Sequence, residues 1–193
     1  MTKSTARQVI VSMGTAARIN RLKAAAYFIE YPDEITNLID LVFDIDFKLH
    51  HKAAWVLEFV LENHIDWLVP HLDTFTKQLA KLKNDSALRP IAKICQWIAY
   101  EYVYKKNKSF TNSLTNKQIN LIIESSFDWM IGEYRVATKV YTMDTLYYFG
   151  CLNLNDLSWV HSELKNIILQ HIHLGSAGYQ SHGKKIITLL DKK

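Results

Sequence analysis

The chain has 193 residues, of which 49% are hydrophobic and 22% are charged, and its formal net charge is +4. This length suits a single domain with a core of its own, and the composition is that of a globular protein. The weak positive charge is compatible with an anionic partner but does not require one.

The cysteines and the apolar runs exclude several classes of protein. Cys95 and Cys151 are the only cysteines and lie far apart, which excludes a disulfide framework and a CxxC-type zinc site. Residues 1–18 lack the apolar core of a signal peptide, and no apolar run approaches the roughly 20 residues of a membrane span. We therefore expect a reducing, cytoplasmic location and no membrane partner.

Turn-forming residues divide the chain into segments whose apolar residues recur every three or four positions, as on one face of a helix. No run of strict alternation predicts a strand. In chain order, helices are expected at 4–12, 15–30, 33–44, 47–62, 65–82, 86–105, 116–131, 134–149, 155–173 and 177–191. Pro70 falls inside the fifth helix, so a break or a kink is expected there. N-caps are expected at Asp33, Asp85, Asn116 and Asn155.

The later helices repeat. The segments "ALRPIAKICQW" and "YRVATKVYTMD" align without a gap, so that 46 residues separate Arg89 from Arg135 and Lys93 from Lys139. The same interval leads from Lys139 to Lys185. A fixed period of two helices indicates an α-solenoid, in which helix pairs stack on one another.

Residues around these helix starts carry a family resemblance. In "NDSALRPIAKI", Asp85 precedes the pair Leu88-Arg89, which resembles the acidic turn and the apolar-Arg pair of a HEAT repeat. "GEYRVATKVYTM" keeps Glu133 and Arg135 in the same places. "DFKLHHKAAWVLEFV" keeps an acidic and a basic residue, whereas "YQSHGKKII" has lost both.

The resemblance implies an all-α superhelix of HEAT-like, ARM-type helix pairs. About four repeats would occupy 33–191, after N-terminal helices in 1–32, within a single solenoid domain spanning 1–193. Small bacterial HEAT-like proteins are similar in size, and some carry the name adenylosuccinate lyase. Such lyases have a mobile serine loop of the form GSSxMPxKxN, of which "GSAGYQSHGKK" at 175–185 shares only a Gly-Ser.

Basic and aromatic residues on the second helices form the candidate binding site. On a helical wheel, Lys93 lies opposite the core residue Ile91 and shares its side with several aromatic residues. The hypothesis is a cationic, aromatic-lined groove formed by Lys93, Lys139, Lys185, Arg89, Arg135, Trp97, Tyr100 and Tyr104. In the alternative, the arginines bond to acidic residues of adjacent turns, and the lysine stems pass over aromatic residues covered by neighbouring helices.

No catalytic signature accompanies this groove. The sequence contains neither a phosphate-binding glycine loop nor a GxSxG or HExxH motif, and its histidines do not converge on a metal site. We therefore assign no catalytic residue, cofactor or metal. Trp97 and Glu101, one helical turn apart, are similar to the tryptophan and acid of HEAT-like alkylpurine DNA glycosylases, in which the acid is Asp.

Three functions remain open at this point. The first is a non-catalytic binding or scaffold protein that uses the concave face of the solenoid, with another protein as its partner and an acidic segment or a nucleic acid as alternatives. The second is a nucleic-acid-binding HEAT-like protein, with the DNA glycosylase type as one form of it. The third is a lyase-like enzyme. Glu58 and Glu62 occupy the first repeat's counterpart of the lysine positions, which disfavours a continuous basic groove at that end.

Overall fold

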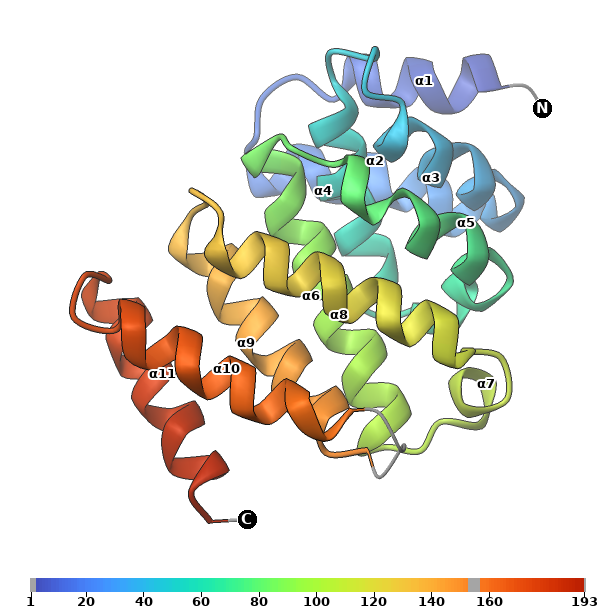
Figure 1. Ribbon diagram of the computed structural model, residues 1–193. Coiled ribbons are helices and arrows are strands. Elements are labelled where there is room, and N and C mark those ends of the chain that lie inside the picture. Colours follow the sequence, from blue (N-terminus) through green and yellow to red (C-terminus); the bar gives the residue numbers. More distant parts are fainter. Residues whose placement is uncertain (1–2, 153–156, 193) are drawn as a thin grey trace. The chain divides into compact units, whose positions relative to one another are not determined.

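The computed structural model describes residues 3–152 and 157–192 (Figure 1). All regular structure in these residues is helical, with eleven α-helices, three short 3-10 helices and no strand, so the all-α prediction is confirmed. The chain divides into two compact units, Met1–Ile94 and Cys95–Lys193, and the boundary falls inside helix α6, Asp85–Val103. No helix in the described residues is both long and apolar enough to cross a bilayer.

The first unit is built around helix α4, His50–Leu61, which packs against α2, Arg18–Glu30, and α3, Ile35–Phe43. Helix α1, Lys3–Ser12, contacts both α2 and α3. The short 3-10 helix η1, Pro32–Glu34, leads directly into α3. Nine of the twelve residues of α4 are buried, and seven of these nine are apolar, including Ala54.

The single helix expected at 65–82 is wrong. The chain there forms three pieces, η2 (Ile65–His71), α5 (Leu72–Gln78) and η3 (Leu79–Lys81). Pro70 lies within η2 and has no N–H to donate, and its ring would clash with the carbonyl of the preceding helical turn. Instead of one helix with a kink at Pro70, the segment therefore consists of three short helices.

The second unit contains the end of α6, the short α7 (Lys108–Thr111), and the helices α8 (Asn116–Ile131), α9 (Val136–Gly150), α10 (Ser158–His171) and α11 (Ala177–Leu190). Helix α9 packs against α8, α10 and α11. This position explains why its sequence is apolar on nearly all sides, since a helix with neighbours on several faces needs no wide polar stripe. Helix α7 was not expected from the sequence.

Two of the expected N-caps are shifted by one residue. Helix α8 is capped by Thr115, whose hydroxyl accepts from the N–H of Gln118 in a capping box, and Asn116 is already helical. The side chain of Asn84 accepts from the N–H groups of Ser86 and Ala87 at the start of α6, in the place expected for Asp85.

The N-caps expected at Asp33 and Asn155 are not confirmed. Asp33 lies inside η1, whose N-cap is Tyr31, so the expected cap is wrong. Asn155 lies outside the described residues.

Candidate functional site

In the first unit, Arg89 and Lys93 converge on one buried carboxylate. A terminal nitrogen of Arg89 donates to Oε2 of Glu58 at 2.8 Å, and Nζ of Lys93 donates to Oε1 at 3.0 Å. The Glu58 side chain is only 6% exposed, so the two cations offset the cost of burying its charge. The partner of Arg89 therefore lies within α4, and not in an adjacent turn as the resemblance implied.

The aromatic side expected on α6 is present as a cluster of three tyrosines, which we call the tyrosine cluster: Tyr100, Tyr104 and Tyr148. Tyr100 stacks on Tyr104 at 5.6 Å between ring centroids, and Tyr148 of α9 contacts Tyr104 edge-on at 5.1 Å. Tyr100 and Tyr104 are exposed, whereas burial and the charge of Asp144 raise the pKa of Tyr148 to about 12.

In the Trp97–Glu101 pair, the carboxylate of Glu101 is already engaged in hydrogen bonds. Glu101 is buried and accepts hydrogen bonds from Nζ of Lys105 at 2.6 Å and from Nδ2 of Asn107 at 3.1 Å. Trp97 is half-buried and has contacts of its own. Both oxygens of Glu101 thus hold the end of α6 against the segment that follows it.

Asp144 joins three helices of the second unit. Its Oδ2 accepts from Nε2 of Gln96 at 2.6 Å, and its Oδ1 lies 2.9 Å from Nε2 of His182. An Asp–His pair resembles part of a catalytic triad, which also needs a hydroxyl or thiol on the imidazole. No hydroxyl or thiol of the described residues bonds to His182, so this group ties α6, α9 and α11 together.

Cys151 and His161 are also neighbours without being a nucleophile and its base. The thiol of Cys151 donates to the carbonyl oxygen of Tyr147 at 3.1 Å, and Nε2 of His161 lies 2.9 Å from the same oxygen. Because a carbonyl only accepts, Nε2 must carry its proton and cannot remove one from the thiol. The 4.0 Å separation between Sγ and Nε2 follows from this shared acceptor.

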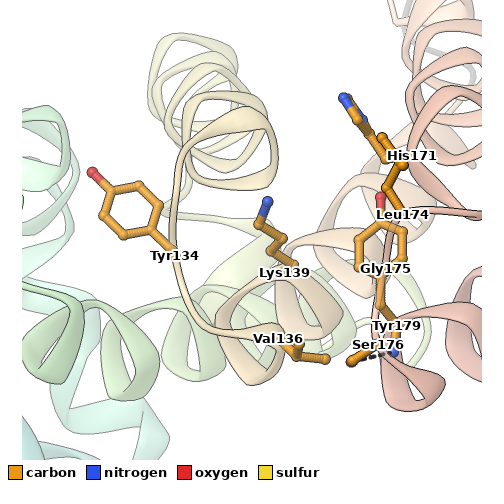
Figure 2. A pocket seen from close by; sticks show the side chains of 8 residues that line it. All are labelled: Tyr134, Val136, Lys139, His171, Leu174, Gly175, Ser176 and Tyr179. Carbon is orange, nitrogen blue, oxygen red and sulfur yellow. Dashed lines mark hydrogen bonds between the residues drawn. The ribbon is translucent and has the colours of Figure 1, made fainter.

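Lys139 borders a cavity of about 270 Å³, which we call the Lys139 cavity (Figure 2). Its lining comes from the start of α9 and the residue Tyr134 before it, the end of α10, the turn that follows α10, and the start of α11. The lining residues are Tyr134, Val136, Lys139, His171, Leu174, Gly175, Ser176 and Tyr179. The ammonium of Lys139 has no hydrogen bond or ion pair with any described residue. Burial lowers the pKa of Lys139, and the charge of Glu133 opposes this shift.

The remaining predicted residues lie near this cavity in sequence but do not line it. Arg135 is the N-cap residue of α9, is exposed and has contacts of its own. Lys185 lies on α11 and is exposed. Of the three lysines in register, Lys93 thus belongs to an ion-paired cluster, Lys139 to a cavity and Lys185 to an open surface.

A second cavity of about 570 Å³, which we call the Trp159 groove, was missed by the sequence analysis. It is lined by Glu124, Phe127, Asp128, Ile131, Trp159, Glu163, Ile167, Gln170 and His171. Phe127 of α8 stacks on Trp159 of α10 at 5.4 Å between ring centroids, and Trp159 is 48% exposed. None of the three carboxylates forms an ion pair with the described residues.

A sequence signal for this groove existed on α8. Glu124, Phe127, Asp128 and Ile131 follow the three- and four-residue spacing of one helix face, which therefore mixes acids with large apolar residues. A core-facing stripe does not carry unpaired acids, so this mixture marks a partly exposed face. His171 lines both cavities, and the cationic and acidic cavities therefore adjoin.

No protein-family model, curated protein or solved structure matches the chain. Within the described residues, no group of three or more His, Cys, Asp or Glu side chains could hold a metal ion.

Proposed function

We propose that this chain is a non-catalytic binding protein of HEAT-like helix pairs, and that its second unit binds an acidic segment of another protein. The observation that carries this proposal is the ammonium of Lys139, which borders a cavity and has no anionic partner among the described residues. Lys93, at the same point of the sequence repeat, meets the carboxylate of Glu58 instead. A partly buried cation without a partner is the feature that an acidic ligand would complete.

The helix contacts in the second unit support the repeat architecture. Helices α8 and α9 pack on each other, as do α10 and α11, and these are the pairs expected from the sequence period. Helix α9 also packs against α11, so the second helices of successive pairs are neighbours. This is the relation that stacked repeats require, because each repeat buries its apolar face on the next.

The side chains best suited to chemistry support binding over catalysis. The carboxylate of Asp144 is held by Gln96 and His182, and the thiol of Cys151 donates to a carbonyl oxygen. A nucleophile or a general base needs a free lone pair within reach of a substrate. The carboxylate of Asp144 is instead engaged in contacts between helices, and the thiol of Cys151 in a hydrogen bond to the end of α9.

The charge of the second unit favours a protein partner over nucleic acid. A nucleic acid carries charge along its whole backbone and needs a continuous positive surface. Here the Lys139 cavity adjoins the Trp159 groove with its three unpaired carboxylates. A protein segment can present acidic residues to Lys139 and Lys185 and place other side chains near the groove.

The test is the binding of a fluorescent ten-residue glutamate peptide and of a ten-nucleotide single strand of DNA. We expect the peptide to bind, and the double variant Lys139→Glu, Lys185→Glu to lose this binding while it stays folded. Lys108→Glu, Lys117→Glu is the control, because it makes the same change of charge at exposed lysines of α7 and α8. Lys93 is left unchanged, since a glutamate there would face Glu58.

Two outcomes would contradict the proposal. If both double variants weaken peptide binding equally, binding depends on the net charge of the chain and not on Lys139 and Lys185. If the DNA binds more tightly than the peptide, with an affinity that falls steeply as salt increases, the nucleic-acid function is favoured instead.

A further inference from the structure

Tyr179 places an unpaired hydroxyl at the Lys139 cavity. The residue is 3% exposed, and its buried hydroxyl has no hydrogen-bond partner among the described residues. Figure 2 shows this hydroxyl pointing to the same side as the ammonium of Lys139, with Leu174 and His171 beside it. A buried hydroxyl without a partner costs free energy, which a ligand oxygen would recover.

The position of Tyr179 is set by the turn before α11. A Cβ added to Gly175 would lie 2.5 Å from Cδ1 of Tyr179, so only glycine lets the turn approach the ring this closely. The hydroxyl is therefore held in place before a ligand arrives. Burial raises the pKa of Tyr179, which keeps the hydroxyl protonated and able to donate.

Two helix N-termini contribute further positive charge. Helix α9 begins at Val136 and α11 at Ala177, and a Cβ on Gly178 would lie 3.5 Å from Cγ1 of Val136, so the first turns touch. An N-terminus carries roughly half a positive charge and exposes N–H groups. Arg135 gives α9 no side-chain cap, whereas Ser176 caps the N–H of Tyr179.

Two features act against an anion, but weakly. The end of α10 reaches the cavity through His171, whose carbonyl oxygen already accepts from the N–H groups of Leu174 and Gly175. Glu133 adds a negative charge near Lys139, but it is exposed and therefore screened by solvent. The ammonium of Lys139 and the hydroxyl of Tyr179 are donors at the cavity without a hydrogen-bond partner among the described residues.

We propose that the Lys139 cavity binds the phosphate group of a phosphate monoester. One ammonium and two helix N-termini supply roughly two positive charges, which matches the charge of about −1.5 to −2 on a phosphate monoester at pH 7. A carboxylate carries only one negative charge. Tyr134, Val136 and Leu174 line the rest of the cavity and suit a small organic group.

This assignment names a ligand group for the binding surface proposed above and rests on that proposal. The phosphate could belong to a small organic phosphate or to a phosphorylated side chain in the acidic segment. Both sources present the same oxygens to Lys139 and Tyr179, so the experiment includes a probe for each.

The probes are phenyl phosphate, benzoate and phenol, titrated into the full chain by calorimetry at pH 7.5. We expect phenyl phosphate to bind about tenfold more tightly than benzoate, and phenol not to bind. Lys139→Gln should weaken phenyl phosphate binding about tenfold or more, and Glu133→Gln should tighten it. Lys117→Gln is the matched control, because it removes the same charge at an exposed lysine of α8 outside the cavity and should leave the affinity unchanged.

Tyr179→Phe separates binding from folding. Removing a hydroxyl that has no partner should leave the melting temperature unchanged or raise it, while phenyl phosphate binding weakens about fivefold. The proposal is overturned if benzoate binds as tightly as phenyl phosphate, or if Tyr179→Phe binds phenyl phosphate with unchanged affinity.

A pair of acidic peptides, with serine or phosphoserine at the centre, identifies the source. If the phosphoserine peptide binds more tightly than phenyl phosphate, the group belongs to a protein partner, and otherwise to a small molecule. Phenyl phosphate binding without glutamate-peptide binding would sink the acidic-segment proposal alone. The reverse result would sink the phosphate assignment alone.

Discussion

At the scale of single residues, equivalent positions of the sequence repeat meet different surroundings. Lys93 and Lys139 share a register, yet Lys93 lies 3.0 Å from Glu58 and Lys139 borders a cavity. The difference arises because the carboxylate that serves Lys93 comes from α4, far away in the sequence. A charged side chain is therefore assigned a role by its neighbours in space rather than by its register.

The Arg89–Lys93–Glu58 cluster gives the first prediction. Glu58→Gln removes the negative charge that pairs with two partly buried cations, whose side chains are 31% and 23% exposed. We expect the free energy of unfolding to fall by about 1–3 kcal/mol, measured by urea denaturation. Glu62→Gln, one turn on and exposed, is the control, with a change of less than about 0.5 kcal/mol. Equal losses in the two variants would mean that Glu58 adds nothing specific.

The tyrosine cluster gives a prediction about alkaline stability. The pKa of Tyr148 is raised to about 12 in the folded state, above the usual value of 10. Folding therefore favours the protonated phenol, and this stability is present below pH 10 and is lost as the pH rises towards 12. We expect the urea midpoint to fall over this range, and Tyr148→Phe to reduce the fall.

Tyr148 accounts for only part of this effect, because burial and Cys151 also raise the pKa of Tyr104. The urea midpoints of Tyr148→Phe and of the wild-type chain should therefore approach each other as the pH rises. The midpoint of the variant should still fall with pH, because Tyr104 remains. Parallel curves for the two proteins between pH 9 and 12 would contradict a role for Tyr148.

At the scale of helices, short polar groups decide where each element begins. Two adjacent polar residues compete at the start of α8, and Thr115 is the cap because its backbone is extended there, with ψ of 157°. At the start of α6, Oδ1 of Asn84 accepts hydrogen bonds from two backbone N–H groups, although Asp85 was the expected cap. A helix start predicted from composition is thus accurate only to about one residue at these sites.

The capping box of α8 gives the third prediction. Thr115→Ala removes the hydroxyl that accepts from the N–H of Gln118, and should lower the free energy of unfolding by about 1 kcal/mol. Asn116→Ala, at the first helical position, should change it by less than about 0.5 kcal/mol. The two variants are compared by thermal denaturation, and the reverse order of stability would restore Asn116 as the cap.

At the scale of the whole chain, function depends on which polar groups remain unpaired after folding. The acids and bases that suggested chemistry are engaged in hydrogen bonds and ion pairs, whereas Lys139, the Tyr179 hydroxyl and the carboxylates of the Trp159 groove have no such partner among the described residues. Unpaired groups at cavities are the ones that a ligand can stabilise.

The Gly-Ser of residues 175–176 gives the last prediction, which concerns the lyase-like alternative. Ser176 accepts the N–H of Tyr179 as the cap of α11, and Gly175 is packed against the ring of Tyr179. Neither residue is arranged as a mobile catalytic loop. We expect no release of fumarate from adenylosuccinate, measured by absorbance with purified chain. Turnover that disappears when a residue of this chain is mutated would overturn this expectation.

The helical architecture could be predicted from sequence because its causes are local. Apolar spacing predicted α8 at the residues observed, and most other helices to within three residues. The interior face of α6 also followed from this spacing, since Leu88, Ile91 and Ala92 are fully buried. Each of these features depends on residues within a few turns of one another.

The candidate sites depended on contacts that no local pattern encodes. The register identified Lys139 but not its cavity, which is formed by helix ends separated by more than thirty residues in the sequence. The sequence did not single out Tyr179, whose buried hydroxyl has no hydrogen-bond partner among the described residues. By itself the sequence determined the helices and their inward faces, because the backbone hydrogen bonds and the helical period are local. Only the tertiary structure decided which charges are neutralised, because ion pairs and cavities form between distant segments after the helices have packed.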